Sequence, residues 1–303
     1  MRSEKINVTV DLDRVRASAE AVRAKTGVRL IAVIKADAYG LGAGPVADAL
    51  SSVADEFGYF TLSEARRVGR PGLIFGPPDG EAAEYRALKV RPAVANREQA
   101  ERLAGMPVAL NVDSGMQRLG CSAEKLEDLI AFCDVSEAFT HADNPASAAR
   151  LRAMCEGHSF PIHAAATSLL DCPEAWLDAV RPGLALYRGA VRVSGRLIAV
   201  RQTAGPIGYT GFECTHVGVM LGGYSNLVSP APVIVNGRRQ RILEVGMNTC
   251  FVSVDPADRV GDEVVLLGDG LTEVELSGCI NIRPHEVLCR YTAMGERRYV
   301  TGG

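Results

Sequence analysis

The sequence predicts an α/β protein in which an N-terminal (β/α)8 barrel, the TIM-like architecture, is followed by an all-β C-terminal domain. From about residue 8 to residue 193, short apolar runs alternate with longer helical patterns, which is typical of parallel βαβ units. From about residue 194, short β-type runs follow one another with turn residues between them. We therefore expect a barrel domain at 8–193 and a β domain at 194–303, with residues 1–7 as candidates for packing against the β domain.

Eight apolar runs supply the strands of the expected barrel. They are residues 29–34, 58–62, 73–76, 92–95, 108–112, 137–140, 161–164 and 180–184. Helical patterns between them include residues 11–26, 44–53, 96–103 and 123–132. The segment is short for this fold, so several helices must be abbreviated.

The expected β domain contains seven further runs and one helix near residues 283–289. The runs are residues 197–203, 217–221, 233–235, 242–245, 251–254, 263–267 and 273–277.

Composition excludes several classes of protein. The 33 basic and 36 acidic side chains give a net charge of −3, so no basic surplus is present to bind nucleic acid or a membrane surface. No apolar stretch approaches the roughly 18 residues that span a bilayer, and residues 1–10 lack the apolar core of a signal peptide. The eight cysteines are scattered without a Cys-x-x-Cys pair, which predicts reduced thiols, a cytoplasmic location and no metal site.

Lys35 is one of only five lysines in the chain, and it directly follows the apolar residues 30–34. It therefore lies at the C-terminal end of the first expected barrel strand, where barrels of this kind build their active sites. A lone lysine there often extends its amine to water. Burial would instead lower its pKa, which is what Schiff-base chemistry requires. Residues 36–44 form a glycine-rich turn that includes Tyr39, and this context favours the second interpretation.

Residues 32–40, Ala-Val-Ile-Lys-Ala-Asp-Ala-Tyr-Gly, closely resemble the pyridoxal-phosphate motif of alanine racemases and their broader-specificity relatives. The match covers nine consecutive residues and is highly specific. The resemblance implies that Lys35 carries pyridoxal 5'-phosphate as a Schiff base and that Tyr39 contacts its phosphate.

Further segments resemble the same family in the family's order, and they imply roles in the barrel. The implied roles are substrate carboxylate binding for Arg118, packing beside the cofactor ring for His141, a phosphate-binding turn at His163 and Thr167, contact with the pyridine nitrogen for Arg181, and backbone donors to phosphate at Gly183 and Leu184. In the β domain, Tyr209 resembles the second catalytic base, while Tyr224 and Met247 resemble substrate-entrance and carboxylate-binding positions.

These residue types suit racemisation, which needs an electron sink and an acid/base group on each face of the α-carbon. Lys35 can serve one face and the Tyr209 phenol the other, with the His141 imidazole available to tune a phenol whose ordinary pKa is about 10. Arg181 stays protonated and only donates, so it leaves the ring nitrogen unprotonated and disfavours transamination.

The sequence also departs from the family. Asn111 stands where many relatives carry a carbamylated lysine, and some relatives with asparagine hold chloride there, so we expect an anion beside Asn111 and Arg118. His285 falls where relatives place a phosphate-binding tyrosine. Because these changes surround the substrate and the phosphate, they leave the identity of the substrate open.

The sequence thus predicts a cytoplasmic pyridoxal-phosphate-dependent isomerase that interconverts the L- and D-forms of a small amino acid. Alanine is the default substrate, and serine or another amino acid is the alternative. The family implies a homodimer whose active sites are shared between subunits. A lyase or decarboxylase, a non-catalytic cofactor carrier and a degenerate homologue are the other interpretations that we weigh.

Overall fold

The computed structural model describes residues 6–302, which divide into two compact units. The barrel unit comprises residues 15–38 and 42–186. The β unit comprises residues 6–14, 39–41 and 187–302. Most of the candidate N-terminal packing segment, residues 1–5, lies outside the described residues. The domain limits 8–193 and 194–303 stay a prediction.

The barrel is closed, and its eight strands follow one another in the order of the sequence. Every pairing is parallel, as βαβ connections require. The strands are β2 (Arg29–Val33), β3 (Glu56–Tyr59), β4 (Gly72–Ile74), β5 (Val90–Val94), β6 (Pro107–Asn111), β7 (Asp134–Ala142), β8 (Ile162–Ala165) and β9 (Ala179–Val180). The predicted barrel is confirmed.

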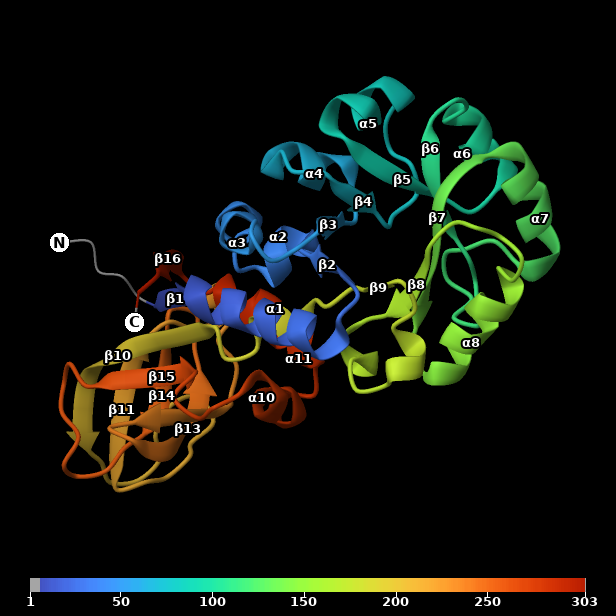
Figure 1. Ribbon diagram of the computed structural model, residues 1–303. Coiled ribbons are helices and arrows are strands. Elements are labelled where there is room, and N and C mark those ends of the chain that lie inside the picture. The colour runs from blue at the N-terminus through green and yellow to red at the C-terminus, as the bar shows by residue number, and fades with distance from the viewer. Residues whose placement is uncertain (1–5, 303) are drawn as a thin grey trace. The chain divides into compact units, whose positions relative to one another are not determined.

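All but one of the helical segments of the barrel have ten residues or fewer, as the length of the segment required, and residues 36–39 form a left-handed turn rather than a regular α-helix. The helical segments are α1 (Leu12–Thr26), α2 (Lys35–Tyr39), α3 (Ala43–Leu50), α4 (Leu62–Val68), α5 (Ala82–Leu88), α6 (Arg97–Arg102), α7 (Ala123–Phe132), α8 (Pro145–Met154) and α9 (Leu184–Tyr187). Only two single-turn 3₁₀ helices, η1 (Thr167–Leu169) and η2 (Pro173–Ala175), connect β8 to β9. Helices α4 to α8 lie on the outside of the barrel strands (Figure 1).

Aromatic and small side chains fill part of the barrel interior. Phe139 of β7 packs with Leu73, Ala93 and Ala109 from β4, β5 and β6. The Phe75 ring lies edge-on to Phe139, with ring centroids 5.5 Å apart. The two alanines leave the space that the Phe139 ring occupies, so large and small residues alternate around the barrel.

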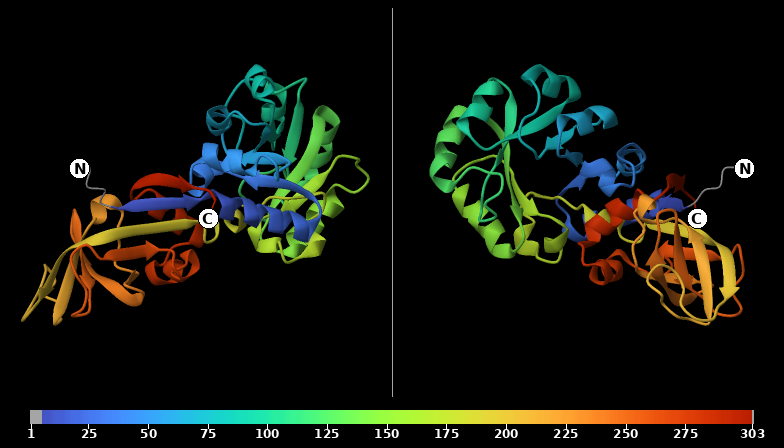
Figure 2. Two further views of the ribbon diagram at one scale, coloured as in Figure 1. Left: turned by 60° about the vertical axis from the view of Figure 1, so that its left-hand side comes forward. Right: turned by 180° about the vertical axis from the view of Figure 1, so that it is seen from behind.

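The β unit is built on an eight-stranded sheet in the order β11-β14-β13-β12-β15-β10-β1-β16. An additional pairing of β10 with β11 brings the sheet back on itself. The elements are β1 (Asn7–Asp11), β10 (Val191–Gln202), β11 (His216–Leu221), η3 (Tyr224–Asn226), β12 (Pro232–Val235), β13 (Arg238–Val245), β14 (Thr249–Ser253), β15 (Glu263–Leu267), α10 (Glu273–Ile280), α11 (Pro284–Thr292) and β16 (Glu296–Val300). Two further views show β10 to β15 in yellow and orange, β1 in blue and β16 in red (Figure 2).

Strands β1 and β16 were not predicted from the sequence. β1 pairs antiparallel with β10 and parallel with β16, so the two ends of the described chain complete one sheet. Such pairings join residues nearly 300 positions apart, and local patterns do not reveal them.

The strand expected at residues 273–277 is wrong, because these residues form helix α10. The run alternates polar and apolar residues, which indicates a strand. However, the Thr272 side chain accepts a hydrogen bond from the Glu275 N–H at 3.2 Å and caps a helix whose first turn holds Glu273 and Glu275. The β unit is therefore rich in strands without being all-β. Across residues 6–302 we find no helix whose length and apolar character would let it cross a membrane.

Candidate active site

Lys35 lies just beyond the C-terminal end of β2, at the barrel mouth where parallel strands end. The four residues that follow it, 36–39, have φ between 53° and 57°. Non-glycine residues rarely adopt this left-handed conformation, which costs roughly 1–2 kcal/mol per residue. The backbone beside Lys35 is therefore strained and has to be held by its surroundings.

Two carboxylates accept the backbone hydrogen bonds that hold this left-handed turn. The Ala36 N–H donates to Glu64 Oε1 at 2.8 Å, and Glu64 Oε2 accepts from the Phe60 N–H at 2.7 Å. The Ala43 N–H donates to Asp37 Oδ1, also at 2.8 Å. Helix α4 thus anchors the turn that positions Lys35.

The surroundings of Lys35 favour its neutral amine. Burial is the largest cause that lowers the pKa of Lys35, and the positive charges of Arg118 and Arg181 lower it further. Glu64 opposes them weakly. The amine also lies 5.7 Å from the centroid of the Phe60 ring. A neutral amine at this position can act as a nucleophile or a base.

Arg181 follows β9, and its side chain is buried at the top of the barrel core. Its Nη2 donates to the carbonyl of Thr140 and, at 2.8 Å, to that of Ala164. The guanidinium carbon lies 5.2 Å from the Phe139 ring centroid. Among residues 6–302, no group accepts a hydrogen bond from Arg181 Nε, although this atom is buried. A buried donor without an acceptor indicates that a ligand atom completes the site.

His141 lies in β7, one residue before the strand ends. Desolvation lowers its pKa to about 4, and the charges of Arg181, Arg118 and Lys35 act in the same direction. The imidazole is therefore neutral at physiological pH, and it can accept as well as donate a hydrogen bond.

Thr167 joins the ends of β8 and β9. Its Oγ1 accepts hydrogen bonds from the Gly183 N–H at 3.3 Å and from the Ala185 N–H at 3.1 Å. Its own hydroxyl hydrogen is then available to donate. The structure thus brings together three of the predicted phosphate-binding positions, Thr167, Gly183 and Leu184.

Asn111 is the last residue of β6 and is only 8% exposed. Within the described chain, no residue forms a hydrogen bond with its side-chain amide. Arg118, from the following loop, is exposed and likewise forms no ion pair within residues 6–302. Both residues line one cavity of about 410 Å³, so the structure places the predicted anion-binding pair at a common site.

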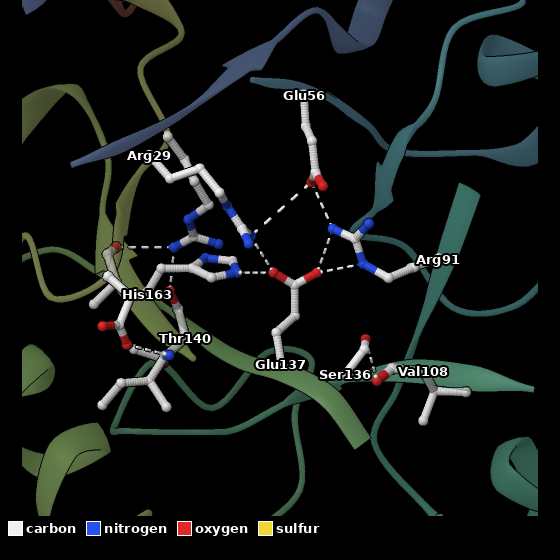
Figure 3. A network of polar contacts seen from close by, with 12 residues as sticks. Arg29, Glu56, Arg91, Val108, Ser136, Glu137, Thr140 and His163 are labelled. Atoms are coloured by element: carbon white, nitrogen blue, oxygen red, sulfur yellow. Dashed lines mark hydrogen bonds and ion pairs between the residues drawn. The ribbon is translucent and has the colours of Figure 1, made fainter. Parts of the chain in front are cut away.

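His163 lies in the barrel interior rather than at the rim. It is fully buried and stacks on Phe139 at a centroid distance of 5.6 Å. Its Nε2 lies 3.1 Å from Glu137 Oε2. Figure 3 shows His163 and two arginines directed at the Glu137 carboxylate.

The ion-pair network around Glu137 was not predicted from the sequence. Arg29 Nη2 and Arg91 Nε lie 2.5 Å and 2.7 Å from the Glu137 carboxylate, and Arg91 also pairs with Glu56 at 2.5 Å. The sequence does contain a signal for this network, because these charged residues interrupt apolar strands, where an unpaired charge would destabilise the fold.

In the β unit, Tyr209, Tyr224 and Met247 are 91%, 56% and 58% exposed. They lie near one another: the Tyr224 N–H donates to the Gly246 carbonyl at 3.0 Å, and a Cβ atom on Gly246 would lie 3.9 Å from the Tyr209 ring. The unit therefore presents the three predicted residues together.

Glu244 fixes the loop that carries Tyr209. Its carboxylate accepts from the Tyr209 N–H at 2.9 Å and from the Thr210 N–H at 2.7 Å. Gly208 has φ of +69°, and a Cβ atom there would lie 2.5 Å from Glu244 Oε1, so this position requires glycine. Hydrogen bonds from the Thr210 hydroxyl and from these amides lower the pKa of Glu244.

Tyr39 and His285 also belong to the β unit. The Tyr39 ring lies 5.2 Å from the Tyr187 ring and edge-on to His285 at 6.4 Å. Burial raises the pKa of Tyr39 to about 12, so its hydroxyl remains protonated and able to donate. The two predicted phosphate contacts thus lie together.

Comparison with known proteins identifies the family of this chain. Residues 10–191 match the family described as alanine racemase, N-terminal domain, and residues 207–299 match alanine racemase, C-terminal domain. This chain belongs to the alanine racemase family. The alanine racemase of Neisseria meningitidis is 31% identical to it, with 94% of this chain and 96% of the relative covered. The biosynthetic alanine racemase of Escherichia coli is 30% identical, with 96% of each chain covered.

Solved alanine racemase structures share the fold. The biosynthetic enzyme of Pseudomonas aeruginosa superposes with a TM-score of 0.88 at 26% identity, covering 98% of this chain and 100% of that one. The Bartonella henselae enzyme, solved with covalently bound pyridoxal phosphate, gives 0.88 at 21% identity, covering 98% and 99%. The alignment with the Neisseria enzyme extends over 343 positions. Because this exceeds the 303 residues here, the relative carries segments that this alanine racemase homologue lacks.

The barrel residues fit pyridoxal phosphate. Arg181 Nε is a buried donor that lacks an acceptor, and such a donor suits an unprotonated pyridine nitrogen. Thr167 retains a hydroxyl donor beside Gly183 for a phosphate. Burial and the charges of Arg118 and Arg181 lower the pKa of Lys35, which is the direction that suits a Schiff-base lysine.

Proposed function

We propose that this chain is an amino-acid racemase that uses pyridoxal phosphate and acts first on alanine. The observation that supports this most strongly is the amine of Lys35 at the mouth of an alanine racemase barrel. Burial and two arginines favour its neutral form.

In this proposal, the residues named from the family resemblance hold the cofactor. Lys35 binds it covalently, and Arg181 donates to its ring nitrogen. The phosphate is held by Tyr39, Thr167 and His285 and by the backbone at Gly183 and Leu184, and His163 supports the site through the barrel core. When bound, pyridoxal phosphate supplies an electron sink that stabilises negative charge at the substrate α-carbon.

Two acid/base groups move the α-proton. The Lys35 amine takes or returns it on one face, and the Tyr209 hydroxyl does so on the other. His141 is neutral near pH 7, so in this proposal its ring nitrogen accepts a hydrogen bond from the Tyr209 hydroxyl and orients it. Arg118 binds the substrate carboxylate, and Tyr224 and Met247 provide the substrate-entrance and carboxylate-binding positions.

We also propose a homodimer with shared active sites and a cytoplasmic location. The exposed group of Tyr209, Tyr224 and Met247 supports a shared site, because these residues offer a second acid/base group on the surface of the β unit. The free thiols of all eight cysteines agree with a reducing compartment.

The decisive test is a chiral assay of the purified protein with pyridoxal phosphate and each common L-amino acid. We expect racemisation of alanine, and borohydride should fix the cofactor on the peptide that contains Lys35. Labelling at Lys25 or Lys89 would contradict the cofactor assignment. Preferred racemisation of serine would change the substrate, release of carbon dioxide or an aldehyde would indicate a lyase, and binding without turnover would indicate a carrier or a degenerate homologue.

Asn111 and Arg118 are proposed to hold a chloride ion. The desolvated Asn111 amide and the unpaired Arg118 guanidinium both favour an anion. We expect activity to rise when chloride replaces gluconate at constant ionic strength. Asn111→Asp, which supplies a negative charge covalently, should make activity independent of chloride. A wild-type rate that is indifferent to chloride would refute this role.

A further inference from the structure

The cavity beside Arg118 extends well beyond the space that a single chloride needs. It has a volume of about 410 Å³, which lies within the range of small-molecule sites, and it lies at the C-terminal ends of β4, β5 and β6. Its lining contains Arg118 and Lys125 but no Asp or Glu. This charge balance favours an anionic ligand.

Two amide side chains in the wall present donors rather than acceptors. Asn96 Oδ1 accepts from the Gln99 N–H at 2.9 Å, and Gln99 Oε1 accepts from the Ala95 N–H at 2.8 Å. A backbone N–H can only donate, so these bonds fix which end of each amide is the oxygen. The NH₂ groups of Asn96 and Gln99 are therefore left to donate.

Asn111 provides a third polar side chain with no partner. It is more than nine-tenths buried, it lines the cavity, and none of residues 6–302 forms a hydrogen bond with its amide. The Asn111 amide therefore keeps both its donor and its acceptor for a ligand in the cavity.

Two cations, Arg118 and Lys125, line this cavity together. The positive charge of Arg118 also lowers the pKa of Lys35 and of His141. Lys125 and Asn96 also line a neighbouring hollow with Phe132 on the outer surface of α6 and α7. No ion pair within residues 6–302 occupies the Lys125 amine.

We propose that this cavity is a binding site for a small dicarboxylate, one carboxylate on Arg118 and Asn111 and the other on Lys125, Asn96 and Gln99. The carboxylate on Arg118 and Asn111 takes the place that chloride fills when no dicarboxylate is bound. Arg118 has five N–H donors, so it can contact this carboxylate and a substrate on its other side. A negative charge beside Arg118 would also offset the effect of that guanidinium on the pKa of Lys35.

The test measures succinate binding to the pyridoxal-phosphate-loaded protein by calorimetry, in gluconate buffer at fixed ionic strength. We expect saturable binding of one succinate per chain. The neutral analogue succinamide should bind at least tenfold more weakly, because charge-assisted hydrogen bonds are lost. Chloride should compete with succinate. Inorganic phosphate should bind more weakly, because it offers one anionic group where succinate offers two.

Isosteric substitutions make the test specific. Gln99→Glu and Asn96→Asp keep the oxygens that accept from Ala95 and Gln99, but they replace the NH₂ donors with negatively charged oxygens. Each should weaken succinate binding tenfold or more and leave the thermal midpoint unchanged. Lys125→Gln should weaken it severalfold, whereas Lys89→Gln, an exposed barrel lysine away from the cavity, should have no effect.

Succinate binding that survives Gln99→Glu and Lys125→Gln would overturn the proposal and place succinate elsewhere, for example at the substrate carboxylate position. Absence of saturable binding would overturn it as well. Because the readout is binding, its result is distinct from the outcome of the racemase assay.

Discussion

At the barrel centre, His163 and Glu137 form a buried pair whose protonation the surroundings fix. Burial lowers the pKa of His163 to about 4, although Glu137 acts in the opposite direction. The hydrogen bond from His163 and the charges of Arg91 and Arg29 hold the pKa of Glu137 well below its ordinary range despite burial. A neutral His163 must then donate from Nε2 to Glu137, which leaves Nδ1 as an acceptor.

This pair predicts a specific dependence of stability on pH. The folded pKa of His163 is lower than the ordinary 6.5, so below pH 6.5 the unfolded chain binds a proton that the folded chain does not. His163 therefore costs no stability above pH 6.5 and increasingly destabilises the fold as the pH falls toward 4. By pH 5 the loss amounts to roughly 2 kcal/mol.

His163→Gln keeps a donor for Glu137 and removes the titration. Between pH 7 and pH 5, urea unfolding should therefore show a smaller loss of stability in the variant than in the wild type. Equal losses in the two proteins would show that His163 does not remain neutral in the fold.

At the scale of single elements, the left-handed turn after Lys35 depends on helix α4. Glu64 accepts from Ala36 in the turn and also from Phe60 and Thr61 at its own helix start, where Thr61 and Glu64 form a capping box. One carboxylate thus links the start of α4 to the strained residues 36–39, which are not glycines and do not favour the left-handed conformation.

We expect Glu64→Ala to destabilise the protein by about 2 kcal/mol, because backbone donors lose their acceptor. Glu64→Gln, which retains one oxygen, should cost less. Glu98→Ala, an exposed first-turn residue of α6, serves as the control and should change stability by less than about 0.5 kcal/mol. Urea unfolding measures all three. A Glu64→Ala effect no larger than that of Glu98→Ala would show that the turn does not need this anchor.

At the scale of the whole molecule, the proposed acid/base pair is divided between the barrel unit and the β unit. Lys35 belongs to the first and Tyr209 to the second. Glu244 and Gly208 hold the Tyr209 loop, yet the phenol itself is 91% exposed. A rigidly anchored but exposed aromatic group is typical of a residue that acts on a partner surface.

Mixed dimers test whether the partner is a second copy of the chain. Lys35→Ala and Tyr209→Phe homodimers should each be inactive, because every site lacks one acid/base group. If the site is shared, a heterodimer of the two has one site with both lesions and one intact site. Dissociation, mixing and reassembly should then restore up to half of the wild-type racemisation rate per heterodimer. No recovery, with subunit exchange verified by mass spectrometry, would place both residues in one chain.

The sequence by itself determined the barrel, the lysine and the strand-end residues. Each barrel strand is buried on both faces, so it appears in the sequence as an apolar run of four to six residues. Such a run can be recognised without knowledge of distant residues. Parallel strands all end at one mouth, which placed Lys35 at the expected active site, and the family resemblance assigned Asn111, Thr167 and Arg181 to the same site. The nine residues around Lys35 supplied the family.

Only the tertiary structure decided the features that depend on distant partners. The helix at Glu273–Ile280, the pairing of β1 with β16, the network around Glu137 and the donor orientation of Asn96 and Gln99 are of this kind. A charged or amide side chain acquires its protonation state and its free hydrogen-bonding groups from neighbours that lie far away in the chain. Those neighbours come together only when the strands have closed into a barrel. The apolar residues whose burial closes the barrel, in contrast, are already present in the sequence of each strand.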